Sequence, residues 1–249
     1  MKFRIALMLV SAAALAACGS KSGDANGTEP VAAAPVAGKA PPAGKQWSEV
    51  VAATPEGGVR MGNPDAPVKL VEFGSRACPY CAQFSANAVP KLVAGPVASG
   101  KVSYEFRDYP IHGSLDIAPI LLGHCVPTEA FFPMLDAMMA AQPQLLAKAE
   151  QVAPAAQALG EPNKIATAFA EQLGYLDFVK QRGLPEAQAR QCLSDPKATE
   201  AIAQRYEAAN KNYTITGTPT LIVNGRNVDL PVGVDMWMTL ERALKAAGV

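Results

Sequence analysis

The sequence predicts an α/β domain in which helices cover both faces of a sheet. Three features lead to this class. Residues 68–73 form an apolar strand pattern that runs through a turn into a helix, and residues 101–107 alternate as a second strand. Near the C-terminus, a strand, a turn and a short partner strand over 220–230 precede a final helix. A mostly helical segment, residues 112–205, separates the two strand-bearing parts.

The first 18 residues are predicted to be an export signal. Lys2 and Arg4 supply its positive end, residues 5–14 its apolar core, and the Leu-Ala-Ala before Cys18 its cleavage region. This end of the signal resembles a bacterial lipobox, in which the cysteine becomes the lipid-bearing mature N-terminus. Gly19 follows where an aspartate would direct inner-membrane retention, so outer-membrane sorting facing the periplasm is favoured. The alternative is a secretory signal with an incidental cysteine.

Residues 19–45 are rich in Ala, Gly and Pro and show no hydrophobic period, so they are predicted to be a disordered tether. The remaining chain is long enough for one elaborated domain. Its predicted parts are a first sheet-bearing part at 46–111, a helical insertion at 112–205 and a second sheet-bearing part at 206–249. The formal charge is zero and no basic stripe is present, which argues against a nucleic-acid partner.

The strand at residues 68–73 leads into a Cys-x-x-Cys pair. Cys78-Pro79-Tyr80-Cys81 opens a helix, and Pro79 suits its first turn because an N–H there has no partner within the helix. The exposed amides and the dipole of a helix N-terminus favour a negative sulfur, which lowers the pKa of Cys78. Cys78 is therefore the predicted exchanging sulfur, and Cys81, one turn later, is the predicted resolving thiol.

In the central part of the chain, the second strand ends before Pro110. Pro119 and Pro133 fit badly inside helices, so the helix boundaries around them stay open. Other helix starts and stops in this segment are predicted at Thr128, Gly174, Gly183 and Asp195.

The C-terminal part reads as a hairpin and a helix. Residues 220–223 form a strand pattern, Asn224-Gly225 is typical of a type I′ turn, and residues 228–230 form a short partner. Asp235 is then placed to cap the final helix.

Four stretches resemble the DsbA family of thiol:disulfide oxidoreductases, which have a thioredoxin fold. In the family's order between residues 61 and 249, they are the strand with Glu72, the Cys-Pro-Tyr-Cys motif, Phe106-Arg107-Asp108-Tyr109-Pro110 and Gly217-Thr218-Pro219-Thr220. The resemblance implies a thioredoxin fold with an inserted helical domain. It implies disulfide exchange with exported proteins or peptides, and a membrane redox partner whose kind, DsbB-like or DsbD-like, stays open. No metal or organic cofactor is required.

The resemblance also implies three further site residues. Pro219 matches a cis-proline that lies against the Cys-x-x-Cys pair, and Thr218 before it would pair with the backbone of a substrate. An ordinary trans-proline is the alternative. Glu72 matches a buried glutamate whose pKa burial would raise, a candidate proton acceptor for Cys81. The alternative is a solvent-facing glutamate on an edge strand.

The five cysteines divide by role. With Cys18 assigned to lipid, an exported chain retains a catalytic pair and, in Cys125 and Cys192, one possible structural bridge of the kind that some DsbA-like proteins carry. Two separately buried thiols are the alternative.

Other chemistries find less support in the pattern. A zinc site would need Cys78 and Cys81 together with Cys125 and Cys192, or a histidine in place of one of them, and no second Cys-x-x-Cys is present. His112 is expected to be a loop or capping residue, and His124 a helix-surface residue. The spacing of Ser75, Asp108 and His112 does not predict a hydrolase triad.

The predicted function is that of a periplasmic, lipid-anchored thiol:disulfide oxidoreductase. The direction of exchange is open, because Pro79-Tyr80 replaces the histidine-containing dipeptide usual in DsbA-like oxidants, and Thr218 is typical of isomerases. An oxidase is preferred, since only a tether, with no dimerisation domain, precedes the fold. The alternatives are a reductase or isomerase of the same fold, or a non-catalytic lipoprotein that binds a partner and uses the cysteine pair as a structural bridge.

Overall fold

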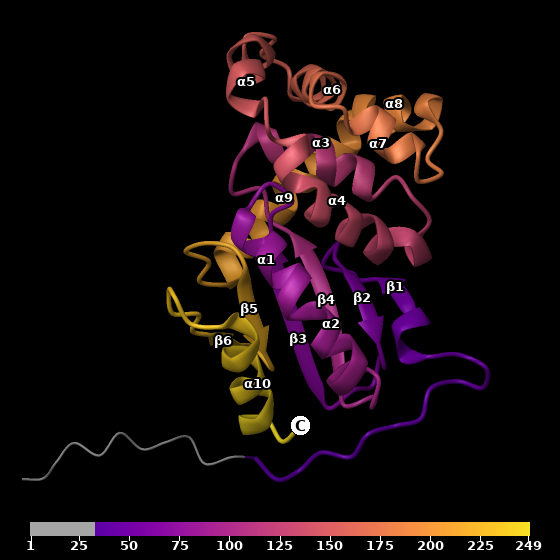
Figure 1. Cartoon of the computed structure of the whole chain (residues 1–249), viewed down its shortest axis with the longest axis vertical. Helices are drawn as coiled ribbons and strands as arrows, with labels where there is room; N and C mark the ends of the chain where they lie inside the picture. Colours follow the sequence, from indigo (N-terminus) through magenta and orange to yellow (C-terminus); the bar gives the residue numbers. More distant parts are fainter. Residues whose placement is uncertain (1–32) are drawn as a thin grey trace, which may run out of the picture. The chain divides into compact units, whose positions relative to one another are not determined.

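A mixed six-stranded sheet forms the centre of the fold in the computed structural model, which describes residues 33–249 (Figure 1). The predicted export signal, Cys18 and the first part of the predicted tether lie outside the described residues. Among the residues that are described, no helix is long and apolar enough to cross a membrane. The strand order is β1-β2-β4-β3-β5-β6, with β1 (Val51–Ala53), β2 (Val59–Gly62), β3 (Val68–Gly74), β4 (Val102–Asp108), β5 (Thr220–Val223) and β6 (Arg226–Val228).

The central strands β3 and β4 are parallel, and the other neighbouring strands are antiparallel. The strands predicted around residues 68, 101 and 220 are confirmed. The hairpin partner of β5 starts at Arg226, not at Val228, because Asn224 and Gly225 both take positive φ values, 48° and 79°. Such a two-residue turn pairs the strands immediately. The short strands β1 and β2 were not predicted.

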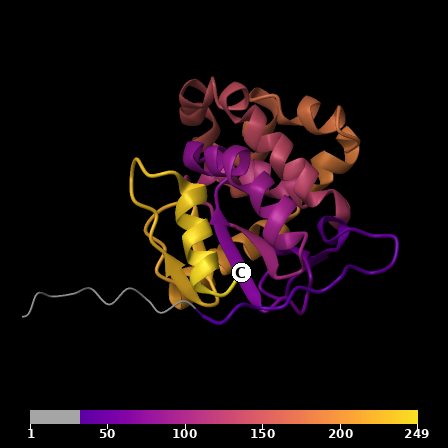
Figure 2. The same ribbon diagram turned by 60° about the horizontal axis from the view of Figure 1, so that its bottom comes forward.

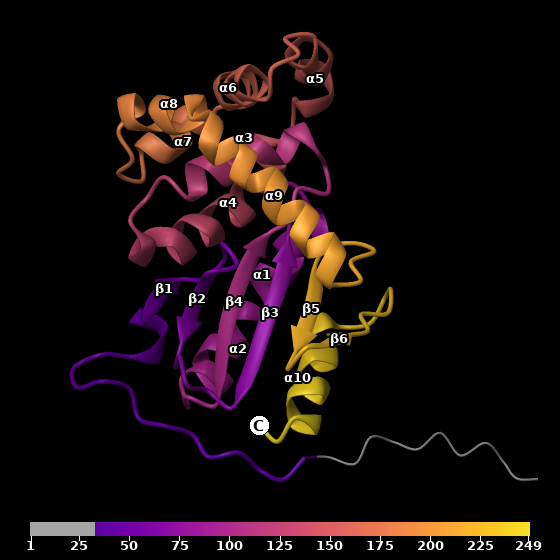
Figure 3. The same cartoon turned by 180° about the vertical axis from the view of Figure 1, so that it is seen from behind.

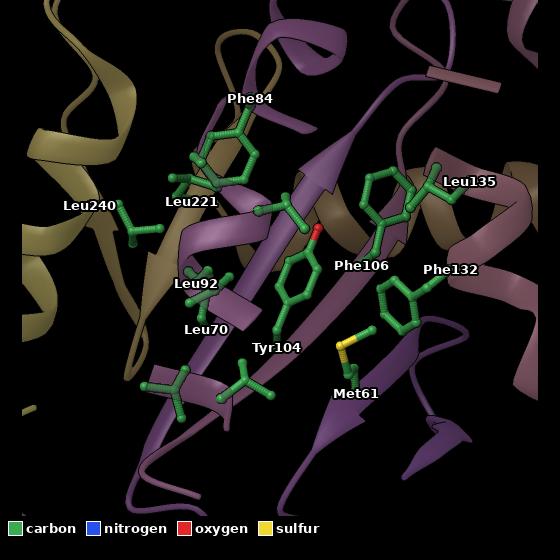
Figure 4. Close-up of a cluster of buried hydrophobic side chains, with 14 of the residues drawn as sticks. Met61, Leu70, Phe84, Leu92, Tyr104, Phe106, Phe132, Leu135, Leu221 and Leu240 are labelled. Atoms are coloured by element: carbon green, nitrogen blue, oxygen red, sulfur yellow. The ribbon is translucent and has the colours of Figure 1, made fainter. Parts of the chain in front are cut away.

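One face of the sheet carries the main core. Alternate side chains of β3 and β4, among them Leu70 and Tyr104, point to this face, where α1 (Pro79–Asn87), α2 (Val89–Leu92) and α10 (Met236–Ala246) pack (Figures 1 and 2). Burying these side chains contributes about 25 cal/mol per Å² of apolar surface. Figure 4 shows how closely the side chains meet between sheet and helices, including Phe84, Leu92, Phe106, Phe132, Leu221 and Leu240.

The opposite face is covered mainly by α9 (Pro196–Asn212), which crosses the end of the sheet where β3 and β4 finish (Figure 3). There Phe73 and Tyr109 pack with Ile222 and Ala209. Helices thus lie on both faces, which confirms the predicted class, but their coverage is unequal. The predicted end of the helical insertion, residue 205, falls within α9, which continues to Asn212.

The helical insertion lies over the same end of the sheet (Figure 1). Gly174 and Gly183 end helical segments as predicted, and the Asp195 side chain caps α9. The helix boundaries left open around the two prolines are now defined. Pro133 is the third residue of its helix, where an N–H has no partner within the helix, and Pro119 lies buried inside another helix. The elements are α3 (Ser114–Gly123), η3 (Thr128–Ala130), α4 (Phe131–Leu145), α5 (Ala149–Gln157), α6 (Pro162–Gln172), α7 (Tyr175–Lys180) and α8 (Glu186–Ser194).

Residues 33–45, assigned above to a disordered tether, lie against the domain. The Ala33 N–H donates to the Ala246 carbonyl at 2.9 Å, and the Val36 N–H to the Gly248 carbonyl at 2.8 Å. The Lys39 N–H donates to the Ser99 carbonyl at 3.1 Å. Composition misled the prediction here, because backbone hydrogen bonds to distant residues do not depend on a hydrophobic period. The helices α3 to α8 together form the helical layer. Residues 33–45 join the domain at the end of the sheet away from this layer (Figure 1).

Candidate active site

The two cysteines lie where the central strand β3 turns into α1. Cys78 is the residue that precedes the first helical residue, Pro79, and its carbonyl accepts the N–H of Ala82 at 3.1 Å. Both thiols are free in this structure, and Cys78 is 5% exposed while Cys81 is fully buried. Strand, turn and proline therefore place Cys78 at the helix N-terminus, as the local sequence predicts.

The two sulfurs differ strongly in acidity. A hydrogen bond from Cys81, supported by Thr218 and by the backbone N–H groups of Cys81 and Tyr80, lowers the pKa of Cys78 from 9.0 to about 5, against the effect of burial. Burial, the bond to Cys78 and the nearby Glu72 raise the pKa of Cys81 well above its usual value. At neutral pH the reduced pair thus holds one thiolate, on Cys78.

The Thr218-Pro219 peptide bond is cis and lies beside the pair. When Cys78 is protonated, its thiol donates to the Thr218 carbonyl at 3.2 Å, across 140 positions of sequence. The Thr218 hydroxyl is buried and has no hydrogen-bond partner among the described residues, which leaves it available to the ionised sulfur. A groove of about 950 Å³ begins here and continues along residues 229–235, where Val232 is 96% exposed.

Glu72 is buried on the central strand β3, between β4 and β5, so the edge-strand alternative is excluded. Its carboxylate accepts a hydrogen bond from the Tyr104 hydroxyl at 2.6 Å. Burial raises the pKa of Glu72 from 4.5 to about 8, although the bond from Tyr104 opposes the rise. At neutral pH this carboxyl is mostly protonated and close enough to Cys81 to influence its charge.

Replacing Glu72 with glutamine should stabilise the protein at neutral and alkaline pH. The folded chain keeps this carboxyl protonated up to about pH 8, whereas the unfolded chain ionises it above 4.5. The favourable contribution is therefore complete below pH 4.5 and is lost as the pH rises towards 8, by about 1.4 kcal/mol per pH unit. In urea unfolding between about pH 4 and 9, the advantage of E72Q should grow to roughly 5 kcal/mol. The surface variant Glu150→Gln is the control. A difference in stability between E72Q and the native protein that is the same at all pH values would contradict the raised pKa of Glu72.

A buried ion pair beneath the active-site turn was missed by the sequence prediction. The Arg76 side chain is fully buried, and its Nε donates to Asp108 Oδ1 at 2.7 Å. The guanidinium also faces the rings of Phe106 and Phe131. Burial alone would raise the pKa of Asp108, but Arg76 and His124 lower it to about 2. The sequence feature that could have revealed this ion pair is a charged residue at the end of each of two strands: Arg76 follows β3, and Asp108 ends β4.

His124 was predicted to be a helix-surface residue, and this is wrong. Its side chain is 27% exposed, and its Nε2 lies 2.8 Å from Asp108 Oδ2. The prediction failed because the partner carboxylate comes from β4, sixteen positions earlier.

Gln142, from α4, ties the helical layer to the active-site turn. Its buried side-chain amide donates to the carbonyls of Arg76 and Cys78, both at 3.0 Å. No local pattern marks this residue, since a glutamine within an amphipathic helix usually faces solvent. It gives the Arg76 carbonyl in the turn a partner and adds a second donor to the Cys78 carbonyl, which already accepts the N–H of Ala82.

Cys125 and Cys192 form a disulfide within the helical layer, with a Cα to Cα distance of 6.1 Å. The bridge joins the segment after α3 to α8 and takes up two of the sulfurs that the zinc alternative required. Ser75 and His112 are close, but the buried acid beside them is Asp116 and not Asp108.

These features define a class of site: a Cys-x-x-Cys pair at a helix N-terminus, beside a cis-proline loop on a mixed sheet. The family model described as Thioredoxin matches residues 54–244, and the chain belongs to this family.

Known structures and sequences place the chain near the DsbA-like members. A protein-disulfide isomerase from Novosphingobium aromaticivorans is 28% identical, with a TM-score of 0.67 over 74% of this chain and 94% of that one. Wolbachia pipientis alpha-DsbA1, 19% identical, shares the fold with a TM-score of 0.59 over 81% and 96%. A Rickettsia bellii protein named Putative protein-disulfide oxidoreductase is 24% identical over 66% of this chain and 56% of its own length. The chain thus spans about half the length of the curated relatives it matches. The predicted fold, a DsbA-like thioredoxin fold with a helical insertion, is confirmed.

Proposed function

We propose that this chain exchanges disulfides with exported proteins or peptides through Cys78 and Cys81. The observation that carries the proposal is the asymmetry of the pair: an acidic, slightly exposed sulfur at a helix N-terminus and a buried sulfur with a raised pKa. An inert structural bridge needs no such difference. Membership of the thioredoxin family and the likeness to a protein-disulfide isomerase support this class of reaction.

In the proposed oxidation, a substrate thiolate attacks Cys78 in the oxidised pair. A mixed disulfide forms, the bond to Cys81 breaks, and the departing Cys81 thiolate takes a proton, for which Glu72 is the proposed donor. A second substrate thiolate then attacks the substrate sulfur of the mixed disulfide, and Cys78 leaves as a thiolate. The substrate loses two electrons and two protons; the pair gains the electrons and one proton, and the other proton goes to solvent.

The groove beside Thr218 and Pro219 is the proposed substrate site. An extended peptide there would pair with the Thr218 backbone while its sulfur meets Cys78. The exposed Val232 and Val234 favour apolar side chains next to the reacting cysteine.

Oxidation is the proposed direction. A low pKa of Cys78 stabilises the reduced pair, and a dithiol that is stabilised in this way makes its disulfide a stronger oxidant. The surroundings of Cys78 therefore supply the stabilisation of the thiolate that the Pro79-Tyr80 dipeptide does not.

The first test is the equilibrium of the Cys78–Cys81 pair with glutathione, read by mass-tagging free thiols and mapping the tagged peptides. Ready reduction by the glutathione pool would support a donor of disulfides. A pair that stays oxidised in strongly reducing buffer would overturn the direction and favour a reductase. Cys125 and Cys192, mapped in the same samples, are the internal control.

A second test separates exchange from mere binding. A Cys81→Ser variant should accumulate mixed disulfides on Cys78 when it is mixed with an unfolded protein that contains a disulfide. The Cys78 thiolate attacks this disulfide, one substrate sulfur leaves as a thiolate, and the thiol that would resolve the mixed disulfide is gone. The matched control is the Cys78→Ser/Cys81→Ser double variant. A single variant that traps nothing would favour the non-catalytic binding module.

The reduced protein should lose stability as the pH falls from 9 towards 5. Because folding lowers the pKa of Cys78 from 9.0 to about 5, its contribution is complete above 9 and is lost as the pH falls through about 5. Allowing for solvent near the sulfur, we expect the Cys78 thiolate to contribute roughly 2 kcal/mol to the free energy of unfolding at pH 7. Urea unfolding of reduced and oxidised protein across this range checks it, since the disulfide form lacks this titration.

We further propose that the protein is lipid-anchored through Cys18 in the periplasm, on the outer membrane. The lipobox-like sequence supports the anchor. Ala33 lies against the end of α10, away from Cys78, so an anchor on this side would leave the active site facing the periplasm. Incorporation of labelled palmitate that is lost in Cys18→Ala, with fractionation of the two membranes, tests this proposal.

A further inference from the structure

A polar cluster outside the Cys-x-x-Cys motif links His112 to the redox pair. His112 lies in the loop between β4 and α3, and its Nδ1 is 3.0 Å from Ser75 Oγ and 3.5 Å from Asp116 Oδ2. The His112 backbone N–H donates to the same Asp116 oxygen at 2.9 Å. Ser75 and Asp116 are fully buried, whereas the His112 side chain is 39% exposed. The imidazole is therefore anchored on one edge and open to protons on the other.

Hydrogen-bond capacity determines which ring nitrogen carries a proton in the neutral state. The Ser75 hydroxyl donates its only proton to Asp116 Oδ1 at 2.8 Å, so its oxygen can only accept from the imidazole. Asp116 already accepts from the Ala77 N–H at 3.1 Å. Nδ1 must then be the donor to Ser75, and Nε2 is the nitrogen that gains a proton when the ring becomes charged.

Ser75 connects this cluster to the sulfurs. Its backbone N–H donates to Cys81 Sγ at 3.4 Å, and its carbonyl accepts the Cys78 N–H at 3.3 Å. His112 thus contacts the turn from which both cysteines project, and the charge of Cys78, which appears only in the reduced pair, acts on its ring.

The charged groups that act on the His112 ring are Asp116, from α3, and Cys78, at the start of α1. The hydrogen bond to Asp116, then the charges of Asp116 and Cys78, raise the pKa of His112 against its partial burial. Behind Asp116 lie Tyr175, from α7, and Arg76. Because coupling between two sites is reciprocal, a thiolate that favours the imidazolium is favoured by it to the same extent.

We propose that His112 is a positioning residue for disulfide exchange, whose protonated ring, oriented by Asp116 and Ser75, stabilises the Cys78 thiolate and makes the oxidising strength of the pair depend on pH. The inference rests on the proposed function for its biological meaning. Its physical content, the coupling between imidazole and thiolate, can be measured without any substrate. Tyr80, 57% exposed, carries no positive charge, so His112 supplies a cation that the motif lacks.

The test uses two substitutions of His112 in the full-length protein. The thiolate absorbance of the reduced protein is titrated against pH, and the glutathione equilibrium constant is measured. His112→Gln, which keeps hydrogen bonding and removes the charge, should shift the equilibrium roughly three- to tenfold towards the disulfide. His112→Arg, which restores a positive charge, should recover most of this shift. A purely structural role would leave H112R as impaired as H112Q and would overturn the proposal.

Nuclear magnetic resonance gives the reciprocal measurement. The chain has two histidines, so each ring can be followed separately. The His112 titration midpoint should lie at a higher pH in the reduced than in the oxidised protein. The difference in pH units should equal the rise in the pKa of Cys78 that H112Q causes. Identical His112 midpoints in the two redox states would overturn the coupling. A confirmed coupling in a protein that fails to exchange with a peptide would refute the proposed function alone.

Discussion

Replacing Arg76 with methionine should lower the free energy of unfolding by roughly 3–5 kcal/mol. Arg76 is the direct ion-pair partner of Asp108, whose side chain is only 6% exposed. Methionine matches the length of the arginine stem but leaves the carboxylate charged in a buried site with His124 as its remaining partner. Urea unfolding at about pH 7 measures the loss, a pH at which Asp108, with a pKa of about 2, is ionised in the native chain.

The double variant Arg76→Met/Asp108→Asn is the matched control. It removes both charges, so no uncompensated carboxylate is buried, and most of the lost stability should return. The single variant should also regain stability in acid, where Asp108 becomes protonated. A loss below about 1 kcal/mol in R76M, similar to that of an exposed ion pair, would show that the pair contributes little.

A Cys125→Ala/Cys192→Ala variant should lose about 4 kcal/mol of stability. The cysteines are 67 positions apart, and the disulfide restricts a long loop of the unfolded chain. The bridge lies in the helical layer, so the loss should appear first as faster amide exchange in α3 and α8. Urea unfolding of the oxidised proteins, combined with hydrogen exchange, measures both effects.

The control removes the other pair. Cys78→Ala/Cys81→Ala should leave amide hydrogen exchange in the helical layer unchanged and should abolish peptide oxidation. C125A/C192A should still oxidise peptides at temperatures where it stays folded. If C125A/C192A were as stable as the native chain, the disulfide would add nothing to the free energy of unfolding, and the prediction would be wrong.

The helical layer supports the chemistry of the pair. Gln142 reaches the carbonyls on both sides of the turn, Asp116 holds Ser75, and Asp108 holds Arg76. The carboxylates and the amide come from the helical insertion and from β4, and their partners lie in the turn after β3. The turn before Cys78 is thereby fixed by buried hydrogen bonds, which hold the sulfur at the helix N-terminus.

Local sequence determined much of the fold. The strand at residues 68–74, the helix that starts at Pro79, the Asn224-Gly225 turn and the caps at Asp195 and Asp235 each follow from a few neighbouring residues. In all these cases one backbone preference, or one side-chain oxygen, decides the outcome without help from distant parts of the chain.

Tertiary structure alone decided which residues meet. The contact of Cys78 with Thr218, the cluster of His112 with Ser75, the docking of Val36 and the role of Gln142 all join residues 30 or more positions apart. Buried polar groups must find partners wherever the fold brings a donor and an acceptor together, and that choice leaves no period in the sequence. Of the residues that lower the pKa of Cys78, Cys81 and Tyr80 belong to the motif and Thr218 was pointed to by the family resemblance. The contacts of His112 and Gln142 with the turn before Cys78 were visible only once the chain was folded.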